Sequence, residues 1–129
     1  MTTTATFTTY AAAAAPTTPT IIYSNTARFP LGQIAATPGA LKLLQKTGFS
    51  AAALISRHVH GDWGDLCEDD RAENEFAVNR RLRILSCYPL VDAERLAATP
   101  RDTRSSLPTL WIITEADRSV TTLLRPSDY

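Results

Sequence analysis

Apolar and polar positions change their period along the chain, and these changes mark the expected elements. Residues 29–36 carry spaced apolar side chains around a proline, which predicts a leading strand at a sheet edge or a strand start. Thr37 and Pro38 are typical of an N-cap and a first helical position, and Gly48 is typical of the left-handed residue that ends a helix. The pattern therefore predicts a short helix over 38–47 directly after the strand.

Two more helices are expected in the segment that follows. Ser50 precedes a run with the apolar spacing of a helix, and Gly61 ends that run. Asp65 stands three residues before Glu68, which is the spacing of a carboxylate capping box, and the acidic residues after it suit the positive end of a helix dipole. The third helix should extend from about residue 66 to 80 or 81. Its apolar stripe is narrow, so one face should be exposed to water.

The last part of the chain has the period of β-strands. "RLRILSCYPL" predicts a strand over 82–88 that a proline ends, and "TLWIITEADRSVTTLLRP" predicts a hairpin around the four-residue loop "EADR". Residues 91–108 hold few large apolar groups and are expected to form a surface loop or insertion, with a short helical turn at 92–98. The expected fold class is α+β: one leading strand, three short helices, then an antiparallel sheet ending in a C-terminal β-hairpin.

Length and composition favour one ordered domain. The chain has 129 residues, of which 44% are hydrophobic, and a domain of this size can bury a self-sufficient core. Residues 1–20 are rich in threonine and alanine and are expected to form a flexible tail. Residues 21–129 are expected to form the single α+β domain.

Charge and cysteine content indicate which cellular compartment and which kinds of partner to expect. The formal net charge is zero, so composition does not indicate a nucleic-acid partner, although a local basic patch is compatible with one. Two cysteines are too few for a disulfide framework, which favours reduced thiols in a cytoplasmic protein. No run approaches the roughly 18 apolar residues of a membrane span, so no membrane partner is expected. The oligomeric state is not indicated.

The stretch "HVHGDWGDLCEDD", residues 58–70, gathers two histidines and five acidic side chains. Its start is similar to the HxHxDH motif of metallo-β-lactamase-like hydrolases, in which imidazole and carboxylate groups bind zinc. Trp63 stands where that motif has its last histidine, and the chain has no third histidine. We therefore expect no metal site.

A catalytic interpretation of the same stretch uses acid/base chemistry. His58 or His60 would transfer protons, because imidazole titrates near neutral pH, and Asp62 or Asp65 would orient the ring. In such a small nuclease Arg118 would bind phosphate. The catalytic candidates are thus His58, Asp62, Asp65 and Arg118.

A structural interpretation explains the same residues without catalysis. Gly61 and Gly64 would form a tight turn, Asp62 and Asp65 would cap backbone amides, and Trp63 would fill the core. The phosphate-binding motifs GxxxxGK[ST] and GxGxxG are missing, as are nucleophile elbows, so no cofactor is expected. The structural interpretation is favoured.

A binding protein would instead present polar or aromatic groups on its surface. The candidate binding residues are Trp63, Glu68, Asp69, Glu115 and Asp117. The large apolar side chains of the hairpin are expected in the sheet core rather than at a ligand. They are Trp111, Ile113, Val120 and Leu123.

Four blocks, "FPLGQIAATPGAL", "RHVHGDWGDLCEDD", "RILSCYPL" and "LWIITEADRSVTTLLRPSDY", resemble in order a group of small bacterial proteins of plasmids and integrated mobile elements, the plasmid-related proteins. The resemblance covers about residues 28–129 apart from 91–108. In the pattern of this group the second block is closer to "HVSGDWGD", which matches His58 but not His60. The resemblance therefore argues against a site that needs both histidines.

The resemblance implies a role in the persistence of a mobile element. We expect a small accessory protein that acts by stoichiometric binding to a protein of the host or the element, for example a host defence or replication complex, and so an anti-defence role is one expectation. The alternative is a small RNase-like or toxin-type enzyme that uses His58 as acid/base. An enzyme should place His58 in a concave site with an arginine beside it.

Overall fold

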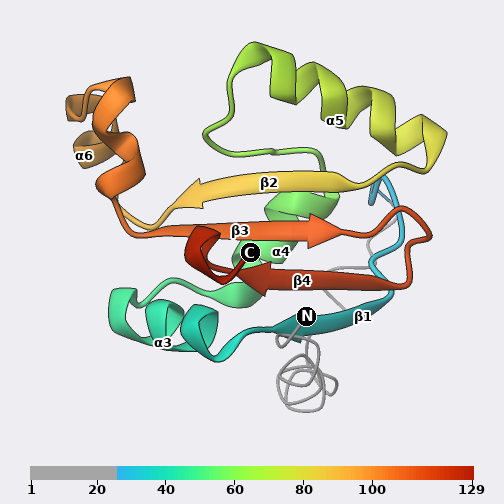
Figure 1. Cartoon of the computed structure of the whole chain (residues 1–129), viewed down its shortest axis with the longest axis horizontal. Helices are drawn as coiled ribbons and strands as arrows, with labels where there is room; N and C mark the ends of the chain where they lie inside the picture. The colour runs from blue at the N-terminus through green and yellow to red at the C-terminus, as the bar shows by residue number, and fades with distance from the viewer. Residues whose placement is uncertain (1–25) are drawn as a thin grey trace.

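The fold is a four-stranded mixed sheet with helices on one face and along one edge (Figure 1). The computed structural model describes residues 26–129, so the tail expected over 1–20 lies outside the described residues. The strand order in the sheet is β1-β4-β3-β2. The strands are β1 (Gln33–Ala36), β2 (Ile84–Pro89), β3 (Thr109–Thr114) and β4 (Val120–Leu124).

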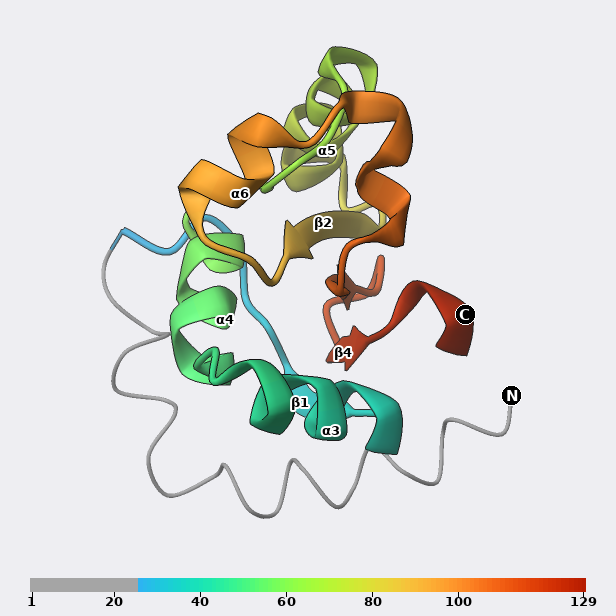
Figure 2. The ribbon, with the colours of Figure 1, turned by 90° about the vertical axis from the view of Figure 1, so that its left-hand side faces the viewer.

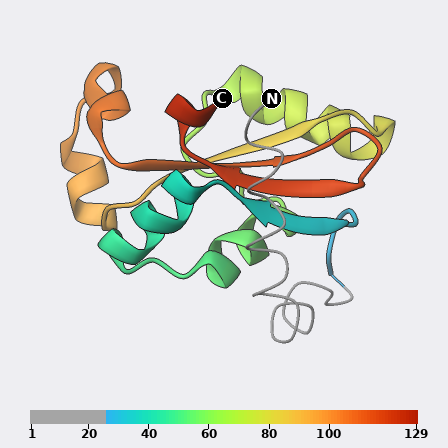
Figure 3. The same ribbon diagram turned by 60° about the horizontal axis from the view of Figure 1, so that its bottom comes forward.

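The helices follow the order expected from the sequence. They are α3 (Pro38–Thr47), α4 (Ala51–Val59), α5 (Glu68–Arg80) and α6 (Ala93–Ala98), with short 3₁₀ turns η1 (Arg101–Ser106) and η2 (Pro126–Asp128). Helices α3 and α4 lie together on one side of the sheet (Figure 3), and α5 lies beside β2 at its edge (Figure 1). The α+β class, the leading strand and the C-terminal hairpin are confirmed.

The leading strand differs from its prediction in length and in direction of pairing. It begins at Gln33 rather than near residue 29, because Gly32 has a φ of 65° and interrupts the extended backbone. It pairs in parallel with β4, while β2, β3 and β4 pair antiparallel to one another as expected. The long connection through the helices and two strands lets the chain return beside β1 in the same direction.

The caps of α3 and α4 confirm the helix starts expected from the sequence. The Thr37 hydroxyl accepts from the Ala40 amide at 3.1 Å, and the Ser50 hydroxyl accepts from the Ala53 amide at 3.2 Å. Gly48 ends α3 with a φ of 78°. These local signals fix two helices whose buried side chains then cover the sheet.

Thr37 also joins the start of α3 to the C-terminal turn, and its loss should be costly. Its hydroxyl donates to the Asp128 carboxylate at 2.6 Å while it caps the helix. We expect Thr37→Val to lower the free energy of unfolding by about 1–2 kcal/mol in urea denaturation, because both contacts disappear. Ser50→Ala, which removes only an exposed cap, should cost less. Equal losses in the two variants would show that the Asp128 contact contributes nothing.

Helix α5 differs from an amphipathic surface helix. It begins at Glu68, its N-cap Cys67 makes no side-chain capping bond, and the predicted capping box of Asp65 and Glu68 is wrong, since Asp65 binds arginines elsewhere. Phe76, a large apolar residue of this helix, is 51% exposed. The helix is attached mainly by polar side chains.

The outer edge of β2 is closed by these polar contacts. The Asn74 amide group donates to the Leu85 carbonyl at 2.7 Å and accepts from the Leu85 amide at 3.1 Å. Further along, the Cys87 amide donates to the Trp63 carbonyl at 3.0 Å, and the Cys87 carbonyl accepts from the Asp65 amide at 2.7 Å. The groups that an edge strand usually leaves unpaired are therefore occupied.

The segment 91–108 is more ordered than the loop expected for it. The helical turn expected at 92–98 is confirmed as α6, with the Asp92 side chain accepting from the Arg95 amide at 2.7 Å. After it, η1 leads into β3 and lies opposite the C-terminal turn η2 across one end of the sheet (Figure 2). The hairpin loop has five residues rather than four, because β4 begins only at Val120.

Candidate functional site

His58 lies in the core between α4 and the inner face of the sheet. Its ring is fully buried, with Nδ1 2.6 Å from the Ser86 hydroxyl and Nε2 2.9 Å from the Thr114 hydroxyl. The Thr114 hydroxyl is in turn 2.7 Å from the Thr121 hydroxyl, which donates to the Leu31 carbonyl. These groups form one continuous chain of polar contacts through an apolar interior.

The hydrogen-bond donors in this series of contacts determine which ring nitrogen of His58 carries the hydrogen. Thr121 uses its only hydrogen on the Leu31 carbonyl, so Thr114 must donate to Thr121 and accept from His58. His58 therefore carries its hydrogen on Nε2 and accepts from Ser86 at Nδ1. With a neutral ring, every polar atom in this series of contacts has a hydrogen-bond partner.

Burial lowers the pKa of His58 to about 3, with a further contribution from the positive charge of Arg118. The ring is consequently neutral near pH 7, has both nitrogens occupied by hydroxyl groups and has no exposed surface. The alternative function needs His58 to exchange protons with a substrate. The buried position of the ring does not support this acid/base role, which stays a prediction.

The aspartates of the same stretch point to different partners. Asp62 pairs with Arg57, at 2.7 Å between Oδ2 and Nε, and this pairing holds its pKa below the usual range. It also accepts from the Gly64 amide, which agrees with the tight turn expected there. Gly64 has a φ of 79°, and a Cβ at this position would overlap the Cys87 carbonyl, so only glycine fits. Trp63 fills the core as expected and is 3% exposed.

Arg118 has a structural position rather than an exposed one. It is 6% exposed and has a φ of 61°, which turns its side chain inward from the hairpin loop. Its guanidinium donates to the carbonyls of Ala77 at 2.9 Å and Leu82 at 2.7 Å, at the end of α5, and to two carbonyls of its own loop. This is a cation at the negative end of a helix dipole, and it joins the hairpin to α5.

The expected binding residues do not lie together. Trp63 is buried, whereas Glu68 and Asp69 are exposed in the first turn of α5. Glu115 pairs with Arg83 at 3.1 Å, and Asp117 accepts from the amide and hydroxyl of Ser119. The candidates outside the core therefore fall into two groups, one at the start of α5 and one in the hairpin loop.

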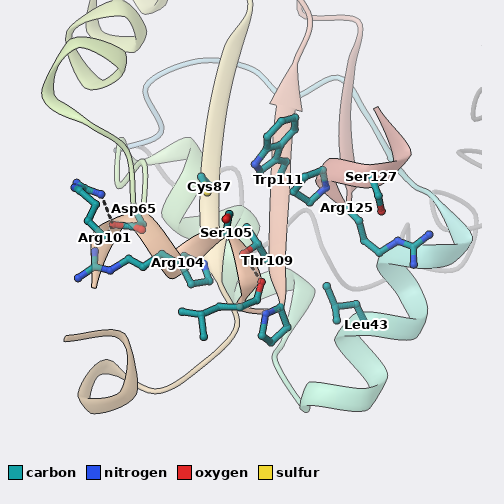
Figure 4. A pocket seen from close by; sticks show the side chains of 14 residues that line it. Leu43, Asp65, Cys87, Arg101, Arg104, Ser105, Thr109, Trp111, Arg125 and Ser127 are labelled. Atoms are coloured by element: carbon teal, nitrogen blue, oxygen red, sulfur yellow. Dashed lines mark hydrogen bonds and ion pairs between the residues drawn. The ribbon is translucent and has the colours of Figure 1, made fainter. Parts of the chain in front are cut away.

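A different site lies on the face of the sheet opposite α4. A pocket of about 560 Å³ is lined by residues from β2, β3, η1 and η2 and by Leu43 of α3 (Figure 4). Cys87 and Trp111 contribute to it from adjacent positions on paired strands, and Arg101 and Arg104 lie on one side. Arg125 and Leu43 lie on the other side. A pocket of this volume suits a small molecule or one segment of a larger partner.

The arginines of the pocket face solvent more than the carboxylates that pair with them. Arg104 and Arg101 approach the same Asp65 oxygen at 2.8 and 3.3 Å, and Arg125 pairs with Asp128 at 2.8 Å. The side chains of Arg101 and Arg125 are 59% and 44% exposed, against 13% and 12% for Asp65 and Asp128. An approaching ligand therefore meets guanidinium groups before it meets carboxylates.

The ionisable side chains deeper in the pocket are not prepared for covalent chemistry. Burial, assisted by the charge of Asp65, raises the pKa of the Cys87 thiol to about 11, so it is protonated near pH 7. Asp65 is held by two guanidinium groups. Among residues 26–129 no three His, Cys, Asp or Glu side chains gather where a metal ion could bind. The donor set of the pocket suits an anion.

The sequence pattern indicates only part of this site. Trp111, expected in the sheet core, is half-buried and lines the pocket, while Ile113 and Leu123 are buried as expected. Arg101 and Arg104 fall in the segment expected to be an insertion, and the cluster of arginines between small polar residues there is the one signal in the sequence. Asp65 is expected from the sequence to cap backbone amides or orient a histidine. In the structure it lines the pocket as the ion-pair partner of Arg101 and Arg104.

Comparisons with known proteins leave the site to be interpreted from its chemistry. No family model matches the chain, and no curated protein or solved structure matches it. Within the described part of the chain, no helix is long and apolar enough to cross a membrane.

Proposed function

We propose that this protein acts in the cytoplasm by stoichiometric binding, as a small accessory protein of a bacterial mobile element, and that the pocket between η1 and η2 holds an anionic group of its partner. The partner is a host defence or replication complex. The observation that carries the proposal is the pair Arg101 and Arg104 beside an apolar floor, with side chains 59% and 23% exposed against 13% for the Asp65 that they share. The mobile-element setting rests on the resemblance in sequence alone.

Binding is favoured over catalysis by the state of the reactive groups. The Cys87 thiol is protonated near neutral pH, because burial raises its pKa to about 11. His58 is buried and neutral on the other face of the sheet, with both ring nitrogens engaged. The carboxylate beside the arginines, Asp65, is already paired with both of them, so the guanidinium groups are suited to bind and orient an anion rather than to assist a reaction.

Affinity purification with matched arginine variants tests this proposal. Wild type, Arg104→Ala and Arg95→Ala are used as tagged baits in lysate of the bacterial host, at low and at physiological salt. Arg95 is an exposed arginine of α6 outside the pocket, so it is a control for lost positive charge. We expect Arg104→Ala to lose a stoichiometric partner that Arg95→Ala retains, with at least about a fivefold drop in recovery.

Two results would contradict the proposal. Equal recovery with Arg104→Ala and Arg95→Ala would mean that the pocket is not the binding surface. Degradation of RNA or arrest of growth by wild type, lost in a folded His58→Gln variant, would establish the enzymatic alternative instead.

A further inference from the structure

The pocket combines guanidinium groups with an indole ring, and this combination narrows the chemistry of its ligand. Arg101 and Arg104 stand three positions apart on η1, and side chains with this spacing in a 3₁₀ turn point in the same direction. Both reach the same Asp65 oxygen, at 3.3 and 2.8 Å. They form one basic corner at the side of the pocket (Figure 4).

Each guanidinium of this corner keeps donors for a ligand. Arg104 donates from Nε to the Thr99 carbonyl at 3.0 Å and from Nη1 to Asp65, which fixes its plane. An arginine has five N–H donors, so those on Nη2 remain to be used. Donors in a fixed plane suit the oxygens of a phosphate group.

Aromatic rings lie beside this corner, one from β3 and one that follows η2. Trp111 lies on β3 between the arginines of the two sides (Figure 4). The Tyr129 ring contacts it at 5.9 Å between centroids, is 63% exposed, and accepts at its hydroxyl from Arg83 at 2.6 Å. Aromatic side chains beside arginines on an open sheet face are the arrangement that stacks unpaired bases.

We propose that the anionic group in the pocket is a nucleotide unit of a single-stranded nucleic acid, with a phosphate at Arg101 and Arg104 and a base against Trp111. This inference rests on the proposed function and names its ligand. An acidic peptide would use the arginines but offers no flat ring next to each negative charge, whereas a nucleotide offers both. The zero net charge of the chain is compatible with a short contact of this kind, because the charge that matters is local.

The negative charge of Asp65 should lower the affinity for this ligand, so removing that charge should raise it. The Asp65 carboxylate pairs with the two guanidinium groups that a phosphate would also contact, and it lies in the lining of the pocket. Asp65→Asn removes the competing charge but keeps an oxygen for the arginines. Single-strand affinity should therefore rise, by about threefold or more, whereas a variant that only damages the fold would lower it.

The test is a titration of the full chain with a fluorescein-labelled twelve-residue oligothymidylate at 50 mM NaCl, followed by anisotropy. We expect micromolar binding, weakened about fivefold or more by Arg104→Ala and by Trp111→Leu, since stacking of one base contributes roughly 5- to 150-fold. Arg95→Ala and Phe76→Leu are the matched controls outside the pocket, and circular dichroism checks the fold of every variant. Binding should also quench the fluorescence of Trp111, and Trp111→Leu should abolish that quenching while Trp63 still emits.

Parallel arms identify the source of the anion. Thymidine monophosphate reports a free nucleotide, inorganic phosphate a bare anion, and a hexaglutamate peptide an acidic protein segment. The proposal is supported if the oligonucleotide binds most tightly and Asp65→Asn strengthens it.

The proposal is overturned if the oligonucleotide does not bind, if Arg104→Ala and Trp111→Leu bind it like wild type, or if the peptide or a free anion binds better. A host complex that is retained through Arg104 while no oligonucleotide binds would keep the proposed function and remove only the nucleotide assignment.

Discussion

Replacing Arg118 with methionine is expected to lower the free energy of unfolding by about 3 kcal/mol or more. The guanidinium donates to carbonyls of Ala77 and Leu82 at 2.9 and 2.7 Å, and the side chain is 6% exposed. Methionine fills a similar volume but cannot donate, so the Leu82 carbonyl loses this charged donor. The Ala77 carbonyl keeps only its backbone contacts with the amides of Arg81 and Leu82. The end of α5 and the hairpin loop should then separate more easily, and urea denaturation measures the loss.

Arg81→Ala is the matched control for this experiment. Arg81 is also an arginine with positive φ, 54°, at the end of α5, but it is exposed. We expect it to change the free energy of unfolding by less than about 1 kcal/mol. Similar losses in Arg81→Ala and Arg118→Met would show that the buried donor contacts of Arg118 are not what holds the hairpin to α5.

Acid should destabilise the protein well before its carboxylates are protonated. Burial lowers the pKa of His58 from 6.5 to about 3, so below pH 6.5 the unfolded chain binds a proton that the folded chain does not. The stabilising contribution is complete above pH 6.5 and is lost as the pH falls toward 3. At pH 5 the loss should be about 2 kcal/mol, since each pKa unit corresponds to about 1.4 kcal/mol.

Urea denaturation between pH 7.5 and 5 measures this loss, and His58→Gln is its comparison. Glutamine can accept from Ser86 and donate to Thr114 but does not titrate, so its stability should be nearly constant over this range. Nitrogen NMR of the imidazole should show the Nε2–H form still present at pH 5. A His58→Gln variant with the same slope as wild type would assign the acid sensitivity to other groups.

The parts of the fold that depend on local chemistry are predictable from the sequence. Thr37, Ser50 and Gly48 set helix boundaries through their own caps and backbone angles, and the alternation of strand residues places the hairpin. The attachment of α5 is not predictable in this way, because Asn74 and Glu75 hold it through polar contacts that leave no apolar period. The parallel register of β1 with β4 likewise depends on the whole chain.

The pocket is less predictable than the fold for the same reason. Asp65, Cys87, Arg104 and Arg125 are separated by about twenty residues each, and only the tertiary structure brings them to one pocket. His58 shows the converse. Its position in a motif-like stretch suggests a catalytic role, whereas in the structure it is a buried side chain with both ring nitrogens in contact with hydroxyl groups.

The closed edge of β2 also limits how molecules of this protein can join through their sheets. Continuous growth of a fibre by strand addition needs two open edges on every molecule. Asn74 and the backbone of Trp63 and Asp65 occupy the outward groups of β2, so within residues 26–129 the β1 edge is the one left for another strand. An association of this kind would end at a pair.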